Sequence, residues 1–433
     1  MTIKLNPEQQ ALADRIMQGQ SLAIIAEGGT GKSEILKQTL PRLRGVMVVA
    51  PTGAAALQVG MGATTIHRAF GLKPIIQDPT KFKNKIQKPV LNVLKRIKVL
   101  VIDEIGAVRV DLLAAMDARL KMAKENDLPF GGVQCIFVGD VLQATPVLPK
   151  TEYHHYSRMW KGVWFFESEL MRNIPAYTLT RSERNTDERQ MRILQSIRNK
   201  DKYAELALKR LFDESEPYCK DSGKIVLCQF NKQSDAVNQA AFNANKNKEH
   251  TYYAIDDGAP ADLKTLGVPE VVKLKNGLRV MLTTNDVEGD YVNGDTGTVL
   301  SCEDGCVRVL LDRNGFEVVV APYAYQAIKY KARGLGVTAA VVGERIQLPI
   351  KLGYAISIYK AQGATLESAT IDMGSLPERY TMPAMLYVAI SRVRDLRKLS
   401  FVRPPMLSDV KVDIKAVNYY NQLLNGAVNG KEN

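Results

Sequence analysis

Short apolar runs alternate with helical patterns through the first third of the chain. Four of these runs are rich in β-branched residues, lack polar alternation and end in turns that contain glycine or acidic residues. Runs of this kind predict strands of a parallel sheet that is covered on both faces. Helical patterns follow them, for example over residues 32–43 and 111–124. The four predicted strands cover residues 21–26, 45–50, 99–103 and 133–139.

A second set of apolar runs, at residues 224–228, 353–358 and 368–372, predicts another α/β unit. Between residues 278 and 342 the runs are shorter, and Asn-Gly or Asp-Gly pairs separate them. Such pairs favour tight hairpin turns because both positions tolerate a positive φ. The pattern therefore predicts two α/β units, joined near residues 172–181, with a small antiparallel barrel inserted into the second unit.

Composition changes this picture little. The chain has 433 residues, of which 45% are hydrophobic and 24% charged, and these values are ordinary for a globular protein of about three domains. No apolar run is long enough to span a membrane, and the first residues lack the apolar segment of a secretory signal. The five cysteines are few and scattered, which is typical of a reducing compartment. We therefore expect a cytoplasmic protein that does not bind membranes.

The charge of the chain favours a polyanionic partner. There are 58 Lys and Arg residues against 46 Asp and Glu, a net charge of +12. Part of this excess lies between Lys73 and Lys98, where eight basic residues accompany one acid, Asp78. Basic clusters attract nucleic acid phosphates, although a solvated basic loop has the same composition. Charge by itself leaves both interpretations open.

A glycine-rich segment from Ala26 to Ser33 follows the first predicted strand and opens a predicted helix. This context, with the final Gly-Lys-Ser, predicts a P-loop, whose backbone N–H groups surround the phosphates of a nucleotide. Lys32 would contact the β- and γ-phosphates of ATP, and the hydroxyl of Ser33 would bind Mg²⁺. The predicted nucleotide-binding residues of the loop are Gly28, Gly29, Thr30, Gly31, Lys32 and Ser33.

Polar side chains follow two further predicted strands at the same edge of the sheet. Asp103 would hold Mg²⁺ through water, and Glu104 would polarise the attacking water, so this pair indicates hydrolysis rather than transfer to an acceptor. Gln143 can both donate and accept hydrogen bonds and would sense the γ-phosphate or that water. A loop amide without such a role fits the local sequence of Gln143 equally well.

Taken together, these segments resemble the motifs of superfamily 1 helicases of the B branch, the Pif/RecD type. The matching segments run in the family's order from residue 5 to residue 392. Two positions depart from the usual pattern: residues 143–146 read Gln-Ala-Thr-Pro where the family has Gln-Leu-Pro-Pro, and Tyr359 replaces a common His. The matches are the adenine-reading Gln motif at Gln9, motif Ia at 50–56, motif III at 139–147, motif IV at 180–184, motif V at 357–365 and motif VI at 387–392.

The resemblance implies a fold class and domain boundaries. The fold would be α/β, with two RecA-like P-loop domains, ATP in the cleft between them and an inserted SH3-like β-barrel. Residues 1–178 would form the first RecA-like domain, in which 72–96 would be the basic wedge or pin that splits the duplex. Residues 179–276 and 349–433 would form the second domain, and 277–348 the barrel.

The resemblance also implies roles for further residues. Arg184 and Arg392 would be arginine fingers that stabilise charge on the γ-phosphate, although a surface ion pair is the alternative for either one. For Phe70, packing in the core is the favoured alternative to a contact with nucleic acid. The implied nucleic-acid-binding residues are Thr52, Thr65, His67, Phe70, Phe82, Lys360 and Thr365.

The expected function is therefore an ATP- and Mg²⁺-dependent DNA helicase. It would translocate 5′ to 3′ on single-stranded DNA, unwind duplexes, and act in DNA replication, recombination or repair. Its partners would be single-stranded and forked DNA and a replication protein such as a single-strand-binding protein, and it would act as a monomer in a bacterial or phage-infected cell. The alternatives are an RNA helicase, a P-loop phosphotransferase, or a DNA-binding module with a vestigial ATP site.

Overall fold

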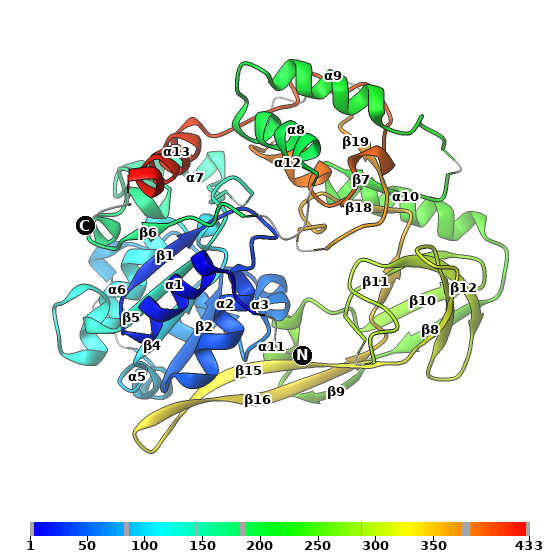
Figure 1. The fold of residues 1–433 in the computed structure, drawn as a ribbon. Helices are drawn as coiled ribbons and strands as arrows, with labels where there is room; N and C mark the ends of the chain where they lie inside the picture. The colour runs from blue at the N-terminus through cyan, green and yellow to red at the C-terminus, as the bar shows by residue number, and fades with distance from the viewer. Residues whose placement is uncertain are drawn as a thin grey trace.

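The computed structural model describes residues 4–81, 86–143, 145–181, 187–220, 222–286, 288–362, 364–374 and 382–429. Two α/β domains and a region of antiparallel strands lie side by side in the ribbon (Figure 1). Two predicted site residues, Phe82 and Arg184, lie outside the described residues. Within the described ranges, no helix is both long enough and apolar enough to cross a membrane.

The first domain contains a parallel sheet of six strands. Its order is β3-β2-β4-β5-β1-β6, and every neighbouring pair is parallel. The central strands are buried along nearly their whole length, which explains why their sequences are continuous apolar runs rather than alternating ones. The four strands predicted here are thus confirmed. The strands are β1 Leu22–Ile25, β2 Val46–Ala50, β3 Thr64–Thr65, β4 Val99–Ile102, β5 Gln134–Gly139 and β6 Ala176–Tyr177.

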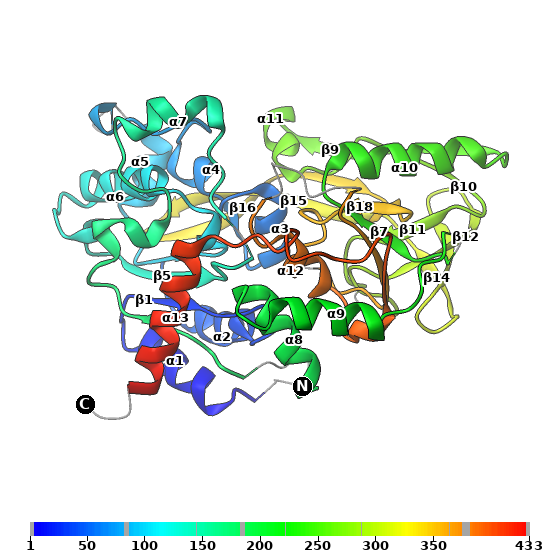
Figure 2. The same ribbon diagram turned by 90° about the horizontal axis from the view of Figure 1, so that it is seen from above.

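Helices cover both faces of this sheet (Figure 2). The helix α13 at the end of the chain also belongs to this layer, because Ala416 and Tyr420 pack in the core of the first domain and the ring of Tyr419 stacks on Phe166 with centroids 4.2 Å apart. This differs from the prediction that residues 349–433 all belong to the second domain. The helices are α1 Pro7–Met17, α2 Lys32–Thr39, α3 Gly53–Val59, α4 Ile66–Phe70, α5 Lys88–Leu94, α6 Val110–Lys124, α7 Lys150–Ser157 and α13 Ile414–Asn429.

The second domain contains a smaller parallel sheet in the order β18-β7-β19-β20. Its core is separate from that of the first domain and includes Leu227, Ile371 and Phe401. The predicted α/β fold with two parallel units is therefore confirmed. The elements are β7 Ile225–Cys228, β18 Ala355–Ser357, β19 Ala369–Asp372, β20 Leu399–Phe401, α8 Glu188–Asn199, α9 Ala204–Glu214, α10 Asn231–Ala244 and α12 Met385–Ile390.

Antiparallel strands occupy the chain between β7 and β18. A five-stranded sheet has the order β14-β13-β12-β11-β17, and the predicted turn residues Gly305 and Gly315 have φ of 81° and 68°. Two strands before residue 277, β8 and β10, pair with each other, so the antiparallel region is longer than the predicted 277–348. Its SH3-like character stays a prediction. The strands are β8 Glu249–Tyr253, β10 Val271–Lys275, β11 Arg279–Leu282, β12 Thr296–Cys302, β13 Val307–Leu311, β14 Glu317–Val320 and β17 Ile350–Leu352.

A long hairpin extends from this region to the first domain. Its strands, β15 Tyr323–Arg333 and β16 Gly336–Gln347, form a sheet with β9 Ile255–Gly258, beside the short helix α11 Pro260–Leu263, and do not join the five-stranded sheet. In Figure 1 the hairpin runs beneath the first domain. The backbone N–H of Val48 donates to the Tyr330 hydroxyl at 2.8 Å, and Arg96 Nε donates to the Gly334 carbonyl at 2.8 Å. The hairpin therefore connects the antiparallel region to the first sheet.

Candidate active site

The loop between β1 and α2 has the backbone of a phosphate-binding loop. Gly29 and Gly31 have φ of 86° and 84°, a region that glycine adopts at no steric cost. Helix α2 begins directly after the loop, at Lys32, so its positive end faces the space that phosphates would enter. The glycines that the sequence analysis assigned to nucleotide binding thus have conformations that suit this role.

Lys32 is half-buried at the end of this loop. Its ammonium donates to the carbonyls of Ala26 at 2.7 Å and Glu27 at 2.6 Å. Burial lowers the pKa of Lys32, while nearby carboxylates, chiefly Asp140, act in the opposite direction. A phosphate bound by the loop would compete with the two carbonyls for this ammonium. Lys32 is therefore a cation that a phosphate could bind, at the position that the P-loop pattern predicts.

Asp103 and Glu104 follow β4 at the edge of the sheet beside the P-loop. Glu104 has φ 52° and ψ 43°, a left-handed conformation that is uncommon for a residue with a side chain and costs on the order of 1–3 kcal/mol. Burial, and after it the charge of Asp103, raises the pKa of Glu104 to about 7. Burial also raises the pKa of Asp103. A carboxylate with a pKa near neutrality suits proton transfer from water.

These groups line a cleft of about 520 Å³ between the two α/β domains. From the first domain, the predicted residues Lys32, Glu104 and Gln143 face it, and from the second domain Arg392 faces it. Arg394, which the sequence analysis did not single out, also lines the cleft. The remaining predicted site residues in its wall are Gly28, Gly29, Gly31, Ser33, Asp103 and Thr365.

Gln143 lies where three of these segments meet. Its side-chain amide is so near the P-loop that a methyl group on Gly28 would come within 2.8 Å of Nε2. Its backbone carbonyl accepts a hydrogen bond from Gln362 Nε2 at 2.9 Å, and its side chain hydrogen-bonds the hydroxyl of Tyr387. These contacts favour a role for Gln143 between the two domains over the interpretation as a loop amide without function.

Arg392 follows helix α12 and is 2% exposed. Its Nε donates to the carbonyl of Val388 at 3.0 Å, and its Nη2 donates to Ser391 Oγ at 2.9 Å. The charge of Arg392 lowers the pKa of Glu104 as one of the smaller contributions, which shows that the two groups share the cleft. The alternative of a surface ion pair is therefore wrong for Arg392.

Comparison with known proteins agrees with this geometry. The model of the family described as PIF1-like helicase matches residues 4–206. An ATP-dependent DNA helicase Pif1 of Bdellovibrio bacteriovorus is 29% identical over 432 residues, which cover 97% of this chain and 92% of the relative. The structure of Bacteroides Pif1 with ADP-AlF4 matches with a TM-score of 0.88 at 27% identity, covering 98% of each chain. Over nearly its whole length the chain is therefore similar to PIF1-like helicases.

The family prediction made from the motifs is thereby confirmed, and with it the assignment of the chain as an ATP-hydrolysing helicase. A Bacteroides Pif1 structure bound to single-stranded DNA gives a lower TM-score of 0.68 at the same identity and coverage. The chain therefore matches the structures without DNA, namely the ADP-AlF4 complex and the unliganded protein with a TM-score of 0.87, better than the DNA complex. The chain covers 60–65% of the length of the vertebrate relatives that it matches.

Gln9 supports the P-loop of this helicase through its side-chain amide. Its Nε2 donates to the Thr30 carbonyl at 3.0 Å, and its Oε1 accepts from the backbone N–H of Asn6 at 2.9 Å. The nitrogen and the oxygen of this amide thus each have a hydrogen-bond partner. A methyl group on Gly31 would lie only 2.2 Å from Nε2 and would collide with it. The structure thus gives Gln9 a supporting role for the loop, and contact with adenine stays a prediction.

The predicted DNA-binding residues differ in their exposure and in their hydrogen bonds. Thr52 and Thr65 cap α3 and α4, where their hydroxyls accept from backbone N–H groups. Each hydroxyl keeps its own hydrogen to donate to a phosphate. Lys360 lies shortly after β18 and is exposed. Burial, and after it Arg109, lowers the pKa of His67, so this ring is neutral at neutral pH and can only be a neutral hydrogen-bond partner.

Phe70 and Thr365 do not lie on an exposed surface. Phe70 is 0% exposed in the core of the first domain, so the predicted contact with nucleic acid is wrong and the alternative of core packing is confirmed. The reason is local: Phe70 ends the five-residue helix α4, whose apolar face is turned toward the sheet. Thr365 lines the ATP cleft rather than an open surface, and its contact with the DNA backbone stays a prediction.

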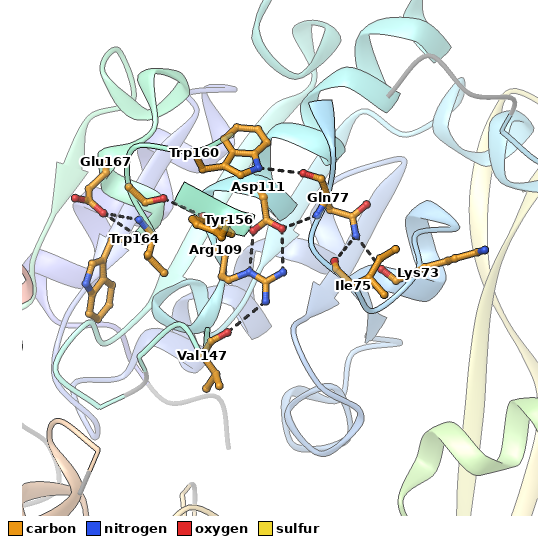
Figure 3. A network of polar contacts seen from close by, with 12 residues as sticks. Lys73, Ile75, Gln77, Arg109, Asp111, Val147, Tyr156, Trp160, Trp164 and Glu167 are labelled. Carbon is orange, nitrogen blue, oxygen red and sulfur yellow. Dashed lines mark hydrogen bonds and ion pairs between the residues drawn. The ribbon is translucent and has the colours of Figure 1, made fainter. Parts of the chain in front are cut away.

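The beginning of the predicted wedge is held by a buried carboxylate (Figure 3). Asp111 is 0% exposed and pairs with Arg109 through two contacts, Nε to Oδ1 at 2.8 Å and Nη2 to Oδ2 at 2.9 Å. The backbone N–H of Gln77 donates to Asp111 Oδ2 at 2.8 Å, and Trp160 Nε1 donates to the Gln77 carbonyl at 3.0 Å. This Asp111 network therefore fastens the beginning of the predicted wedge to helix α6.

Arg198, which is buried between the domains and contacts Glu27 of the P-loop, is not among the residues predicted from the sequence. The available signal was weak, because Arg198 looks like an ordinary basic residue in the last turn of an amphipathic helix. Its position directly after the apolar Ile197 is a weak hint that the sequence offers.

Proposed function

We propose that this PIF1-like helicase couples ATP hydrolysis to 5′-to-3′ translocation on single-stranded DNA and so unwinds duplexes. The observation that carries the proposal is the cleft, which brings Lys32 and Glu104 of the first domain and Arg392 of the second domain into one cavity. Opening and closing of such a cleft with the ATP state would move the domains relative to each other. The direction of movement rests on the family resemblance.

The residues of the cleft fit ATP with Mg²⁺. Ser33 and Asp103 both line it and provide a hydroxyl and a carboxylate, which are ligands that Mg²⁺ accepts. Among the residues that the structure describes, no group of three or more His, Cys, Asp and Glu side chains would hold a metal by itself. This suits Mg²⁺, which usually keeps waters and binds through one or two carboxylates and the substrate phosphates.

In the hydrolysis step, Glu104 accepts a proton from water as the water oxygen bonds to the γ-phosphorus and the bond to ADP breaks. Lys32 and Arg392 stabilise the charge that develops on the transferred phosphoryl oxygens. Arg184 would act with Arg392 as a second arginine finger. Glu104 and the arginine from the second domain disfavour a phosphotransferase, which would need a bound acceptor hydroxyl in place of water.

DNA would cross both domains by contacts to its backbone. Thr52, Thr65 and Lys360 offer hydroxyl and ammonium donors that suit phosphate oxygens without reading sequence. The Bacteroides relative bound to single-stranded DNA supports DNA as the substrate. We infer the same for forked DNA, for action as a monomer in the cytoplasm of a bacterial or phage-infected cell, and for cooperation with a single-strand-binding protein.

The test is unwinding of partial duplexes that carry a single-stranded tail on the 5′ or the 3′ side, with and without ATP and Mg²⁺. We expect opening only when the substrate is a DNA duplex with a 5′ tail and ATP is present. Opening only from a 3′ tail would contradict the polarity, and preference for matched RNA duplexes would favour the RNA helicase. Absence of ATP-dependent opening with every substrate would contradict the proposed function itself.

A further inference from the structure

Arg198 crosses from the second domain into the first. It lies in the last turn of α8, whose Ile193 and Ile197 pack in the core of the second domain. Its side chain is only 1% exposed, whereas Arg192 on the same helix is 81% exposed and pairs with Glu188. A buried guanidinium needs charged or hydrogen-bonding partners to offset its lost hydration, so its partners identify what it holds.

The partners of Arg198 are two carboxylates of the ATP site. Nη1 donates to Glu27 Oε1 at 2.8 Å, and Nη2 donates to Asp140 Oδ1 at 2.7 Å. Glu27 belongs to the P-loop, and Asp140 directly follows β5. One planar guanidinium from the second domain therefore joins two nucleotide-binding segments of the first. We call Arg198, Glu27 and Asp140 the Arg198 bridge.

Two tyrosine rings enclose the same guanidinium. Its Cζ lies 4.2 Å from the ring centre of Tyr420 on α13 and 5.6 Å from that of Tyr387 on α12. Cation–π contacts of this kind strengthen when they are shielded from water. Because Arg392 lies two residues after α12, the Arg198 bridge also contacts the helix that precedes the predicted arginine finger.

Both carboxylates of the bridge are connected to catalytic groups through the backbone. The carbonyl of Glu27 accepts the ammonium of Lys32 at 2.6 Å. The carbonyl of Asp140 accepts the backbone N–H of Gln143 at 3.2 Å. A shift of either carboxylate would therefore displace Lys32 or Gln143. Arg198 itself does not line the ATP cleft, so it acts through these neighbours rather than on the phosphates.

We propose that Arg198 is a positioning residue that transmits closure of the second domain to Lys32 and Gln143. It does so by fixing the P-loop and the segment after β5 through Glu27 and Asp140. Arginine is required because its fork reaches two carboxylates at once, and a lysine ammonium is a single point charge. The inference rests on the proposed function, since domain closure matters only if the cleft hydrolyses ATP.

The test compares Arg198→Lys with Arg192→Lys, a matched change on the exposed face of the same helix. We expect Arg198→Lys to lower kcat of the DNA-stimulated ATPase by roughly 10- to 100-fold, the penalty of a misplaced catalytic group, while KM for ATP stays within about threefold. Arg192→Lys should behave as the wild type. Melting temperatures of both variants record any loss of stability separately from kcat.

Two carboxylate variants, Glu27→Gln and Asp140→Asn, test the bridge from the first domain and serve if Arg198→Lys does not fold. Each should also lower kcat, and combining Arg198→Lys with Glu27→Gln should cost less than the product of the single effects, because both remove one interaction. A wild-type kcat in Arg198→Lys, or a change in KM alone, would overturn the inference. Absence of DNA-stimulated ATPase in the wild type would instead contradict the proposed function.

Discussion

The side-chain amide of Gln143 lies against the α-carbon of Gly28, with no room for a methyl group between them. Gln143 also hydrogen-bonds Tyr387 of the second domain, so a single amide lies between the P-loop and motif VI. Since the colliding atom is the end of a flexible side chain, a methyl group on Gly28 would displace the amide rather than disrupt the fold.

We therefore expect Gly28→Ala and Gln143→Ala to have similar effects. Each should lower kcat for DNA-stimulated ATP hydrolysis by roughly 10- to 100-fold, because each removes the amide from its position. The double variant should be little worse than either single one, since the interaction is lost only once. Steady-state ATPase assays of the three variants measure this. Additive losses would show that Gly28 and Gln143 act independently.

Lys32→Ala should abolish turnover while the fold is retained. The ammonium of Lys32 is the cation of the P-loop, and loss of one such electrostatic contact to the reacting phosphoryl group costs roughly 10²- to 10³-fold in rate. ATPase assays with and without single-stranded DNA give the rate, and circular dichroism gives the melting temperature. Lys37→Ala, at the other end of the same helix, is a matched control that should keep activity. Normal turnover in Lys32→Ala would contradict the P-loop assignment.

Local sequence accounts for much of the fold and of the ATP site. The strands before the P-loop and before Asp103 are continuous apolar runs, and a strand, a glycine turn and a helix in succession leave few alternatives. The conformation of Gly29 and Gly31 follows from the same short segment. These features are predictable because the residues that determine them are adjacent in the chain.

Features that depend on distant residues could not be predicted in this way. Nothing in the sequence around Tyr330 indicates that its hydroxyl meets Val48, 282 residues away. Arg198 is separated from Glu27 by 171 residues, and each looks like an ordinary surface charge. The sequence around Phe70 was compatible with both a core and a DNA-binding position, and only the packing of α4 on the sheet decides between them.

Activity should depend on the ionisation of Glu104. Burial raises its pKa to about 7, and only the deprotonated carboxylate can accept a proton from water. ATPase activity should therefore be low at pH 6, rise through about pH 7 and level off above it. The pH dependence of kcat/KM measures this in the free enzyme. Glu104→Gln, which cannot titrate, should be nearly inactive with no rise in this range. An unchanged rate in the wild type between pH 6 and 8 would contradict the role of Glu104 as the base.

The Asp111 network should support both stability and unwinding. Asp111→Ala leaves Arg109 without its carboxylate and the Gln77 N–H without its acceptor, and loss of one partner of a buried pair costs about 3 kcal/mol or more. Urea unfolding would show this loss. Asp78→Asn is the matched control, because Asp78 pairs with the exposed Lys81 and such a surface pair contributes little to stability.

The Asp111→Ala variant also distinguishes an effect on duplex unwinding by the wedge from an effect on ATP hydrolysis. Because the Asp111 network lies outside the ATP cleft, DNA-stimulated ATPase should fall less than the rate of duplex unwinding in Asp111→Ala, when both are measured below its melting temperature. A proportional loss of both activities would show that the network only stabilises the first domain.

Binding to single-stranded DNA should weaken steeply with salt, and Lys360 should account for part of this dependence. Lys360 is exposed. Burial, and after it the charge of Lys360, lowers the pKa of the neighbouring Lys351 to about 8, so the two cations lie close enough to repel each other. A phosphate between them would relieve this repulsion.

Each phosphate contact that is lost lowers the magnitude of the slope of log K against log salt by about 1. Fluorescence anisotropy with labelled oligonucleotides at several salt concentrations gives the slopes for the wild type, for Lys360→Ala and for Lys209→Ala, an exposed lysine on α9 that serves as the control. If the slope of Lys360→Ala equals those of the wild type and the control, Lys360 does not contact the DNA backbone.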